Sequence, residues 1–148
     1  MTDNIVNTIR YSRHEKLTTY FFDEVKQYRA VLTTRLGSFV GVATCDENDK
    51  FEPYIGNTLA ERRAWMGYRK AMRNRCRNEL EALTNFYSSV KDMKAFDEND
   101  KIVSKLRRAI YEKNDQLNAI KCQISRDYKD IEKIISWVNV NPEKKAAF

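Results

Sequence analysis

The most regular pattern of apolar and polar residues lies in the last third of the chain. Apolar residues recur there in alternating steps of three and four over about five heptads: Val103, Leu106, Ile110, Leu117, Ile120, Ile124, Ile131, Ile134 and Val138. Lys113 and Asp127 interrupt the series, and Tyr128 can substitute beside the second interruption. This spacing predicts a long helix with a heptad seam along one face.

A second long helix is predicted over residues 57–94, with a similar seam: Trp65, Tyr68, Met72, Cys76, Leu80, Leu83, Tyr87, Val90 and Met93. The connection to the last helix is short, so the two are expected to form an antiparallel helical hairpin. Pro53 suits the first turn of a helix. If this helix bends or breaks, we expect it to do so near Gly56 or Gly67.

The pattern changes before residue 57. Residues 29–36 and 38–45 are strand-like runs on either side of Gly37, which predicts a β-hairpin. Residues 13–28 contain apolar positions near helical spacing, and we interpret them as a helix. A strand over residues 17–22 is the alternative, because β-branched and aromatic residues dominate that run. Residues 1–12 lack clear periodicity and are expected to be partly mobile.

Together these elements predict a single-domain α+β protein that is predominantly α. A small head (residues 13–56) contains a helix and the β-hairpin, a long coiled-coil-like helical hairpin covers residues 57–138, and residues 139–148 form a tail. Gly and Pro are scarce, at 4 and 2 of 148 residues, which favours long helices. The pentapeptide DENDK occurs at residues 46–50 and 97–101, and each copy supplies N-cap candidates for the following helix.

The excess positive charge is concentrated in one segment. The chain has 27 basic and 21 acidic residues, a formal net charge of +6. Residues 57–78 contain seven of the basic residues and one acidic residue, Glu61, so this segment alone carries +6. The remaining 20 basic and 20 acidic residues (27 − 7 and 21 − 1) balance. Such a segment suits an anionic partner, although a solvated helix face that keeps the protein soluble is the simpler interpretation.

Helical geometry gathers these cations on one face. At 100° per residue, six of the seven fall within a sector of ~120° beside the apolar seam, and only Arg75 points away. We call these six the basic stripe: Arg62, Arg63, Arg69, Lys70, Arg73 and Arg77. Arginine predominates, and its planar fork binds phosphate or carboxylate through two hydrogen bonds. The stripe predicts binding to nucleic acid or a nucleoprotein complex, with an acidic protein surface as an alternative.

Signs of enzyme chemistry are absent from the sequence. His14 is the only histidine and lies in a charged context with no nucleophile beside it, and there is no P-loop, dinucleotide-binding turn or nucleophile elbow. The acidic loop around Asp46, Glu47, Asp49 and Glu52 fails as an EF-hand and is interpreted as a solvated loop. We therefore expect a non-enzymatic protein with no metal, no cofactor and no small-molecule substrate.

The three cysteines, Cys45, Cys76 and Cys122, are too scattered for a disulfide framework and are interpreted as reduced thiols. The N-terminus does not have the pattern of a signal peptide, and no apolar run approaches ~20 residues. The expectation is a cytoplasmic protein without a membrane partner.

Residues 40–65 resemble a segment of small accessory proteins of bacteriophages that infect Gram-positive bacteria. In that segment a strand with a G-V-A-x-C-like run leads to an acidic turn, D-x-F, and a helix with I-G and A-x-x-R-A. The matching residues here are Gly41, Val42, Ala43, Cys45, Asp49, Phe51, Ile55, Gly56, Ala60, Arg63 and Ala64. The resemblance implies a phage gene product in a bacterial cytoplasm. One form is an inhibitor of a host defence complex such as a CRISPR effector.

The alternative function is structural. In that interpretation the seam of the last helix drives homo-oligomerisation, for example as a homodimer, and the cations pair with acidic residues across the subunit interface.

Overall fold

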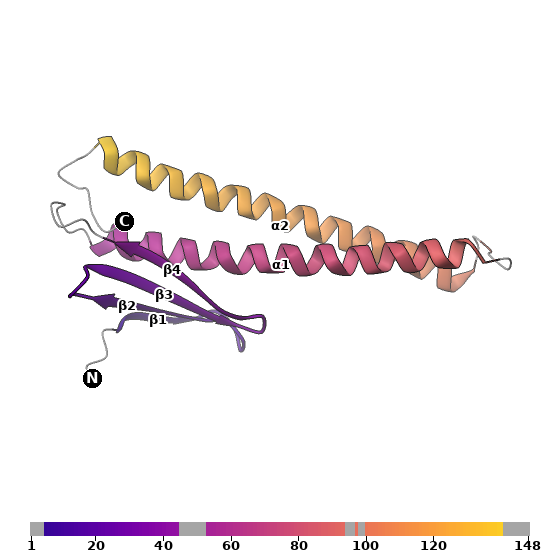
Figure 1. Cartoon of the computed structure of the whole chain (residues 1–148), viewed down its shortest axis with the longest axis horizontal. Helices are drawn as coiled ribbons and strands as arrows, with labels where there is room; N and C mark the ends of the chain where they lie inside the picture. Colours follow the sequence, from indigo (N-terminus) through magenta and orange to yellow (C-terminus); the bar gives the residue numbers. More distant parts are fainter. Residues whose placement is uncertain (1–4, 45–52, 94–96, 98–99, 141–148) are drawn as a thin grey trace. The chain divides into compact units, whose positions relative to one another are not determined.

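The computed structural model describes residues 5–44, 53–93, 97 and 100–140. Its elements are β1 (Ile5–Arg10), β2 (Lys16–Phe22), β3 (Gln27–Thr34), β4 (Gly37–Thr44), α1 (Pro53–Lys91) and α2 (Lys101–Val140) (Figure 1). The predicted class, a predominantly helical α+β protein with a β-hairpin and a long helical hairpin, is confirmed. The chain divides into two compact units. The first unit comprises residues 1–70 and 124–148, and the second comprises residues 71–123.

The strands of the first unit form one antiparallel sheet in the order β1-β2-β3-β4. The predicted hairpin is its β3–β4 half, and Gly37 takes a positive φ of 118° where β4 begins. Residues 13–28, however, do not form a helix: β2 occupies residues 16–22 and pairs with β3 along its whole length. Residues 5–10, expected to be mobile, form β1 and pair with β2.

The error over residues 13–28 has a physical cause. Leu17 and Phe21 fit helical spacing, but side chains also alternate between the two faces of a strand. Leu17 and Thr19 are buried on the face toward α1, whereas Tyr20 and Phe22 lie on the other face. A two-stranded hairpin is marginally stable in water, so pairing with β2 and β1 outweighs weak local helix propensity.

The core of the first unit lies between α1 and one face of the sheet. Leu17, Ala30, Leu32 and Ala43 from the strands pack with Leu59, Ala60, Ala64 and Met66 of α1 and Ile131 of α2. Small residues bring the helix close: a Cβ added to Gly41 would lie 2.0 Å from the carbonyl oxygen of Ala60 and 2.4 Å from the amide nitrogen of Ala64. The β4 strand and α1 are therefore in backbone contact at Gly41.

Both long helices are uninterrupted. The α1 helix continues through Gly56 and Gly67 without a break. The α2 helix begins as predicted at the second DENDK segment, where Asp100 acts as N-cap: its Oδ1 accepts a hydrogen bond of 2.7 Å from the backbone N–H of Ile102. The first DENDK segment lies outside the described residues.

Most of the described residues of the predicted α2 seam are buried, and its two polar interruptions pair with residues of α1. In the second unit, Lys113 Nζ donates to Glu79 Oε2 at 2.6 Å. In the first unit, Arg69 Nη1 donates to both carboxylate oxygens of Asp127 at 2.7 Å, and Asp127 is 0% exposed. Each interruption is therefore one half of an ion pair between the helices, a common way to fix helix register.

The Glu79 pair gives a pH-dependent prediction. Hydrogen bonds from Lys113 and Arg75 lower the pKa of Glu79. A carboxyl group with a lowered pKa stabilises the folded state above its unfolded pKa, and this stability is lost as the pH falls through its folded pKa. Glu79→Gln should therefore reduce the free energy of unfolding at pH 7 by about 1 kcal/mol or less, because the side chain is 41% exposed and partly screened. Urea unfolding of both proteins from pH 7 to pH 3 should show this difference shrinking below pH ~4.5. A difference independent of pH would contradict the assignment.

Candidate nucleic-acid interface

Four cations of the basic stripe lie in the first unit and contact other groups of that unit. Arg69 binds Asp127, and Arg62 Nη1 lies 3.5 Å from Asp130 Oδ2. Arg63 Nη1 donates to the backbone carbonyl of Val42 at 2.6 Å. The Nζ of Lys70 lies 4.9 Å from the ring centre of Tyr128, in cation–π geometry.

These contacts give the four cations a structural role in the first unit. Burial lowers the pKa of Arg63, whose guanidinium satisfies a carbonyl of the edge strand β4. Arg69 also lies over the ring of Trp65, with 5.1 Å between its Cζ and the ring centre. Trp65 and Tyr68 are partly buried and pack against the core of the first unit.

The other two stripe cations lie in the second unit and are differently placed. Arg77 is exposed and Arg73 is half-buried. Arg73 contacts the side-chain oxygen of Asn74 at 3.4 Å, and among the described residues neither arginine has an ion-pair partner. The structure thus divides the stripe into a group engaged in the first unit and a pair available in the second.

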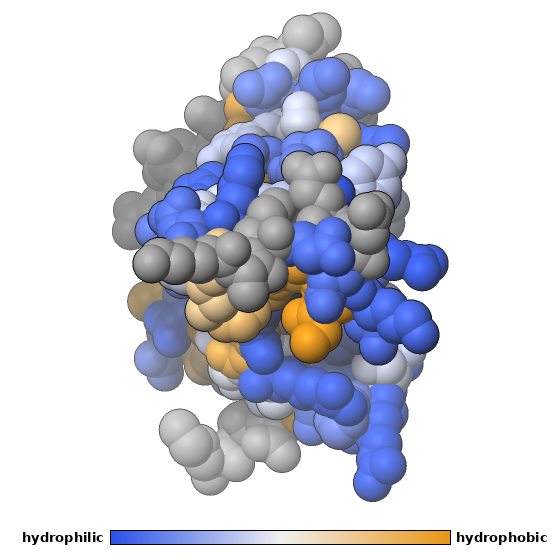
Figure 2. Space-filling view, turned by 90° about the vertical axis from the view of Figure 1, so that its right-hand side faces the viewer, coloured by the Kyte–Doolittle hydropathy of each residue, from blue (hydrophilic) through white to orange (hydrophobic). Residues whose placement is uncertain are grey.

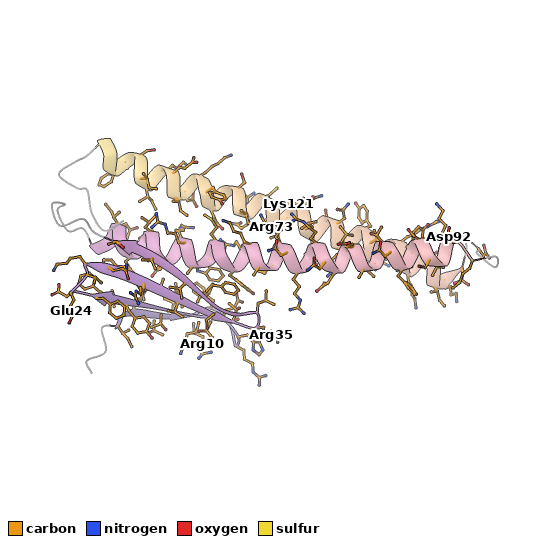
Figure 3. The ribbon with its side chains drawn as sticks, viewed as in Figure 1. Arg10, Glu24, Arg35, Arg73, Asp92 and Lys121 are labelled. Atoms are coloured by element: carbon orange, nitrogen blue, oxygen red, sulfur yellow. The ribbon has the colours of Figure 1, made fainter. Side chains whose placement is uncertain are left out.

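The residue that faces Arg73 across the helical hairpin follows from an observed contact. Arg107 Nε donates to the hydroxyl oxygen of the seam residue Tyr87 at 3.0 Å, which places Arg107 beside the seam at this level. The residue two heptads (14 residues) before Tyr87 in α1 is Arg73, and the residue two heptads after Arg107 in α2 is Lys121. In an antiparallel pair these shifts run in the same direction along the hairpin. Figure 3 labels both residues at the same level of the hairpin. Heptad spacing therefore places these two cations on the same side of the hairpin at about the same level, where coiled coils often place opposite charges.

Heptad positions extend this side of the second unit into a continuous surface. In an antiparallel pair the e and b positions of both helices share one side, beside the seam formed by the a and d positions. We call this surface the basic flank: Arg73, Arg77, Thr84 and Lys91 of α1, which border the seam residues Leu80 and Tyr87, and Ser104, Arg107, Tyr111, Asn114, Asn118 and Lys121 of α2. Five of these residues are basic and none is acidic.

The asymmetry of charge is confined to that side. On the opposite flank of the same helices, the basic residues Arg75 and Lys105 are joined by the acidic Glu112. Arg75 is also paired with Glu79 at 3.0 Å, and Glu112 with Arg108 at 3.1 Å. The opposite flank of the second unit therefore carries both signs of charge, whereas the charged residues of the basic flank are all cations.

Three members of the basic flank were not among the predicted site residues: Lys91, Arg107 and Lys121. The wheel drawn for α1 alone cannot place residues of α2, and Lys91 lies beyond the segment with the highest charge density. The signal that identifies them is the heptad position of each cation on both helices, once the helices are paired.

The remaining candidate groups that the structure describes do not come together in one site. His14 is exposed, Cys76 is buried against the backbone carbonyl of Lys113, and Cys122 is an exposed free thiol. The acidic loop and Cys45 lie outside the described residues. Within the part of the chain that the structure describes, no group of three His, Cys, Asp or Glu side chains is placed to hold a metal ion. No helix in that part is long and apolar enough to cross a membrane.

Comparison with protein-family models, with curated proteins and with solved structures finds no match to this chain. The resemblance of residues 40–65 to phage accessory proteins is therefore a prediction that these comparisons leave untested.

Proposed function

We propose that this protein is a non-enzymatic binding protein that engages nucleic acid, free or within a nucleoprotein complex, through the basic flank of its second unit. The observation that supports this is the like-charged pair of Arg73 and Lys121 in a row of five cations with no acidic residue. Like charges facing each other reduce stability. Phosphate groups relieve that repulsion and release counterions when they bind.

The other residues of the flank suit a phosphate backbone. Asn114 and Asn118 are exposed hydrogen-bond donors between the cations, and Tyr111 presents a hydroxyl group from a side chain that is 74% exposed. From Arg73 to Lys91 the flank extends 18 residues along α1, or about 27 Å. This length spans about eight base pairs of duplex at 3.4 Å per pair.

Neutralising the facing pair should weaken binding without weakening the fold. We expect Arg73→Gln/Lys121→Gln to reduce affinity for a 20-base-pair duplex by roughly tenfold or more at low salt. The slope of log affinity against log salt concentration should become shallower by about 2, because two fewer phosphates are neutralised when the duplex binds. Fluorescence anisotropy of labelled duplex at several salt concentrations measures both quantities.

The matched control is Lys101→Gln/Lys105→Gln, which removes the same charge from exposed positions outside the basic flank. This control should retain the affinity and the salt slope, apart from a small non-specific decrease. The Arg73→Gln/Lys121→Gln variant should unfold at the same or a slightly higher urea concentration, because a repulsive pair is removed. If the two double variants lose affinity equally, the basic flank is not the binding surface.

The biological form of this binding rests on the phage resemblance. We propose a phage-encoded protein of the bacterial cytoplasm that binds a host nucleoprotein complex and inhibits a defence enzyme such as a CRISPR effector. A pull-down from the host with and without nuclease treatment distinguishes a nucleic-acid partner, lost on treatment, from a protein partner, which is retained.

A second candidate, a homo-oligomeric structural or assembly protein, is favoured by one observation. Exposed apolar side chains occur near the turn between α1 and α2: Phe86, Met93 and Ile102 are 56%, 61% and 67% exposed. Figure 2 faces this end of the second unit and shows a small apolar area among hydrophilic side chains. Among the described residues of the α2 seam, Val103, Leu106, Leu117, Ile120, Ile124 and Ile131 are buried within the chain, which argues against assembly through that seam. A monomer mass independent of concentration in light scattering would exclude this candidate.

A further inference from the structure

The face of the sheet turned away from α1 has an unusual composition. The strand register places these residues on it: Ile5, Thr8 and Arg10 of β1, Lys16, Thr18, Tyr20 and Phe22 of β2, Gln27, Arg29, Val31 and Thr33 of β3, and Ser38, Val40, Val42 and Thr44 of β4. We call this set the outer face. It contains three basic residues, no acidic residue, two aromatic rings and four aliphatic side chains. Ile5 and Val40 are 48% and 56% exposed, whereas solvated sheet faces are normally polar.

An aromatic and cationic platform lies on this face. Tyr20 and Phe22 are stacked, with ring centres 6.3 Å apart and an angle of 30° between the ring planes. The guanidinium of Arg29 lies over the Phe22 ring, with 4.8 Å between its Cζ and the ring centre. Arg29 is held there by Gln27, which accepts a hydrogen bond from it and donates one to Thr44 Oγ1 at 3.0 Å. Arg29 is itself exposed, so the platform ends in a flat cation that faces solvent.

We propose that the outer face of the sheet binds single-stranded nucleic acid, with unpaired bases stacking on Tyr20, Phe22 and the Arg29 guanidinium. Aromatic rings and arginine planes are the groups on which proteins stack splayed-out bases. Arg10, Lys16 and Arg29 provide the positive charge that the phosphate backbone requires. An acidic protein partner would use the cations but leave the paired rings unexplained.

The spacing of the rings favours a single strand over a duplex. Tyr20 and Phe22 are two residues apart on one strand, and their ring centres are 6.3 Å apart. Bases in a duplex repeat every 3.4 Å and expose only their edges in the grooves, so they cannot stack on both rings. An extended single strand can place consecutive bases at the wider spacing. This site lies wholly in the first unit and does not depend on the basic flank, which lies wholly in the second.

The test uses the full chain and fluorescein-labelled 12-nucleotide oligo-dT and oligo-rU, with a 12-base-pair duplex for comparison. We expect Tyr20→Leu/Phe22→Leu, which removes both rings but keeps apolar bulk, to weaken binding of the single strands by roughly 5- to 150-fold for each stacked base lost. Duplex binding should be unchanged. The control is Phe86→Leu, which removes an exposed ring from the second unit. Preference for one of the two oligonucleotides identifies the sugar that the site favours.

Two binding results would each overturn the proposal: no saturable binding of either oligonucleotide by the wild-type protein, or equal affinity of a folded Tyr20→Leu/Phe22→Leu variant. Cross-linking of the wild-type protein tests the site even if the double variant fails to fold. Cross-links from an oligo-rU carrying 4-thiouridine should map to residues 16–29, and cross-links confined to residues 71–123 would refute the site. The basic flank is tested separately, since Arg73→Gln/Lys121→Gln affects duplex binding whether or not the sheet binds single strands.

Discussion

Replacing Gly41 by alanine should destabilise the first unit by about 3 kcal/mol or more. The added Cβ would lie 2.0 Å from the carbonyl oxygen of Ala60 and 2.4 Å from the amide nitrogen of Ala64. Both are backbone atoms of α1, so no side-chain rotation can relieve the clash. Either α1 moves away from the sheet or β4 detaches from β3, and both changes open the core around Leu32 and Leu59. Urea unfolding followed by tryptophan fluorescence measures the loss, because Trp65 and Trp137 both belong to this unit.

Gly67→Ala is the matched control for this prediction. A Cβ at Gly67 would lie 3.7 Å from the side chain of Phe39, an ordinary van der Waals distance. Gly67 is inside α1, where alanine is favoured over glycine by about 0.5–1 kcal/mol, so this variant should be slightly more stable than the wild type. The same chemical change thus has opposite signs at the two positions. Equal stability of Gly41→Ala and the wild type would show that β4 does not contact α1 as described.

The long helices were predictable because their information is local. A heptad seam and an Asp N-cap can be recognised within one segment, and α2 begins where the Asp97–Lys101 copy of DENDK predicts. The β3–β4 hairpin was predictable for a similar reason, since Gly37 marks its turn. The strand β2 was not, because Leu17 and Phe21 satisfy helical and strand spacing equally. The choice is made by backbone pairing with β3, which residues 13–28 alone do not reveal.

The candidate sites also combine features that one segment of sequence reveals with features that depend on distant residues. A helical wheel of one segment groups six cations on one face of α1, but whether a cation is free depends on elements distant in sequence. Arg63 reaches the carbonyl of Val42, and Arg69 reaches Asp127, 58 residues later. Conversely, Lys121 becomes relevant only when the register of the hairpin places it opposite Arg73. Local charge density therefore identified a candidate surface but not which of its residues are available to a partner.

Truncating Asp127 to alanine should cost about 3 kcal/mol of unfolding free energy. Asp127 is 0% exposed and accepts two hydrogen bonds of 2.7 Å from Arg69, whose side chain is 24% exposed. Without the carboxylate, the guanidinium stays largely removed from water with no anion beside it, and the seam of α2 acquires a cavity. Urea unfolding at pH 7 measures the effect. Asp130→Ala is a suitable control, because the Arg62–Asp130 pair is 3.5 Å apart and more exposed and should contribute under about 1 kcal/mol.

The double variant Arg69→Met/Asp127→Leu should recover most of the stability that Asp127→Ala loses. The seam positions before and after Asp127 are the apolar residues Ile124 and Ile131, so an apolar pair at this level continues the seam. Replacing both members of a buried ion pair removes the desolvation cost of the two charges as well as their attraction. The net effect on the free energy of unfolding is often neutral or favourable. A double variant as unstable as Asp127→Ala would show that Asp127 does not stabilise the fold mainly by neutralising Arg69. Recovery would show instead that the pair contributes little net stability. Its role would then be to fix which residues of α1 and α2 face each other in the first unit.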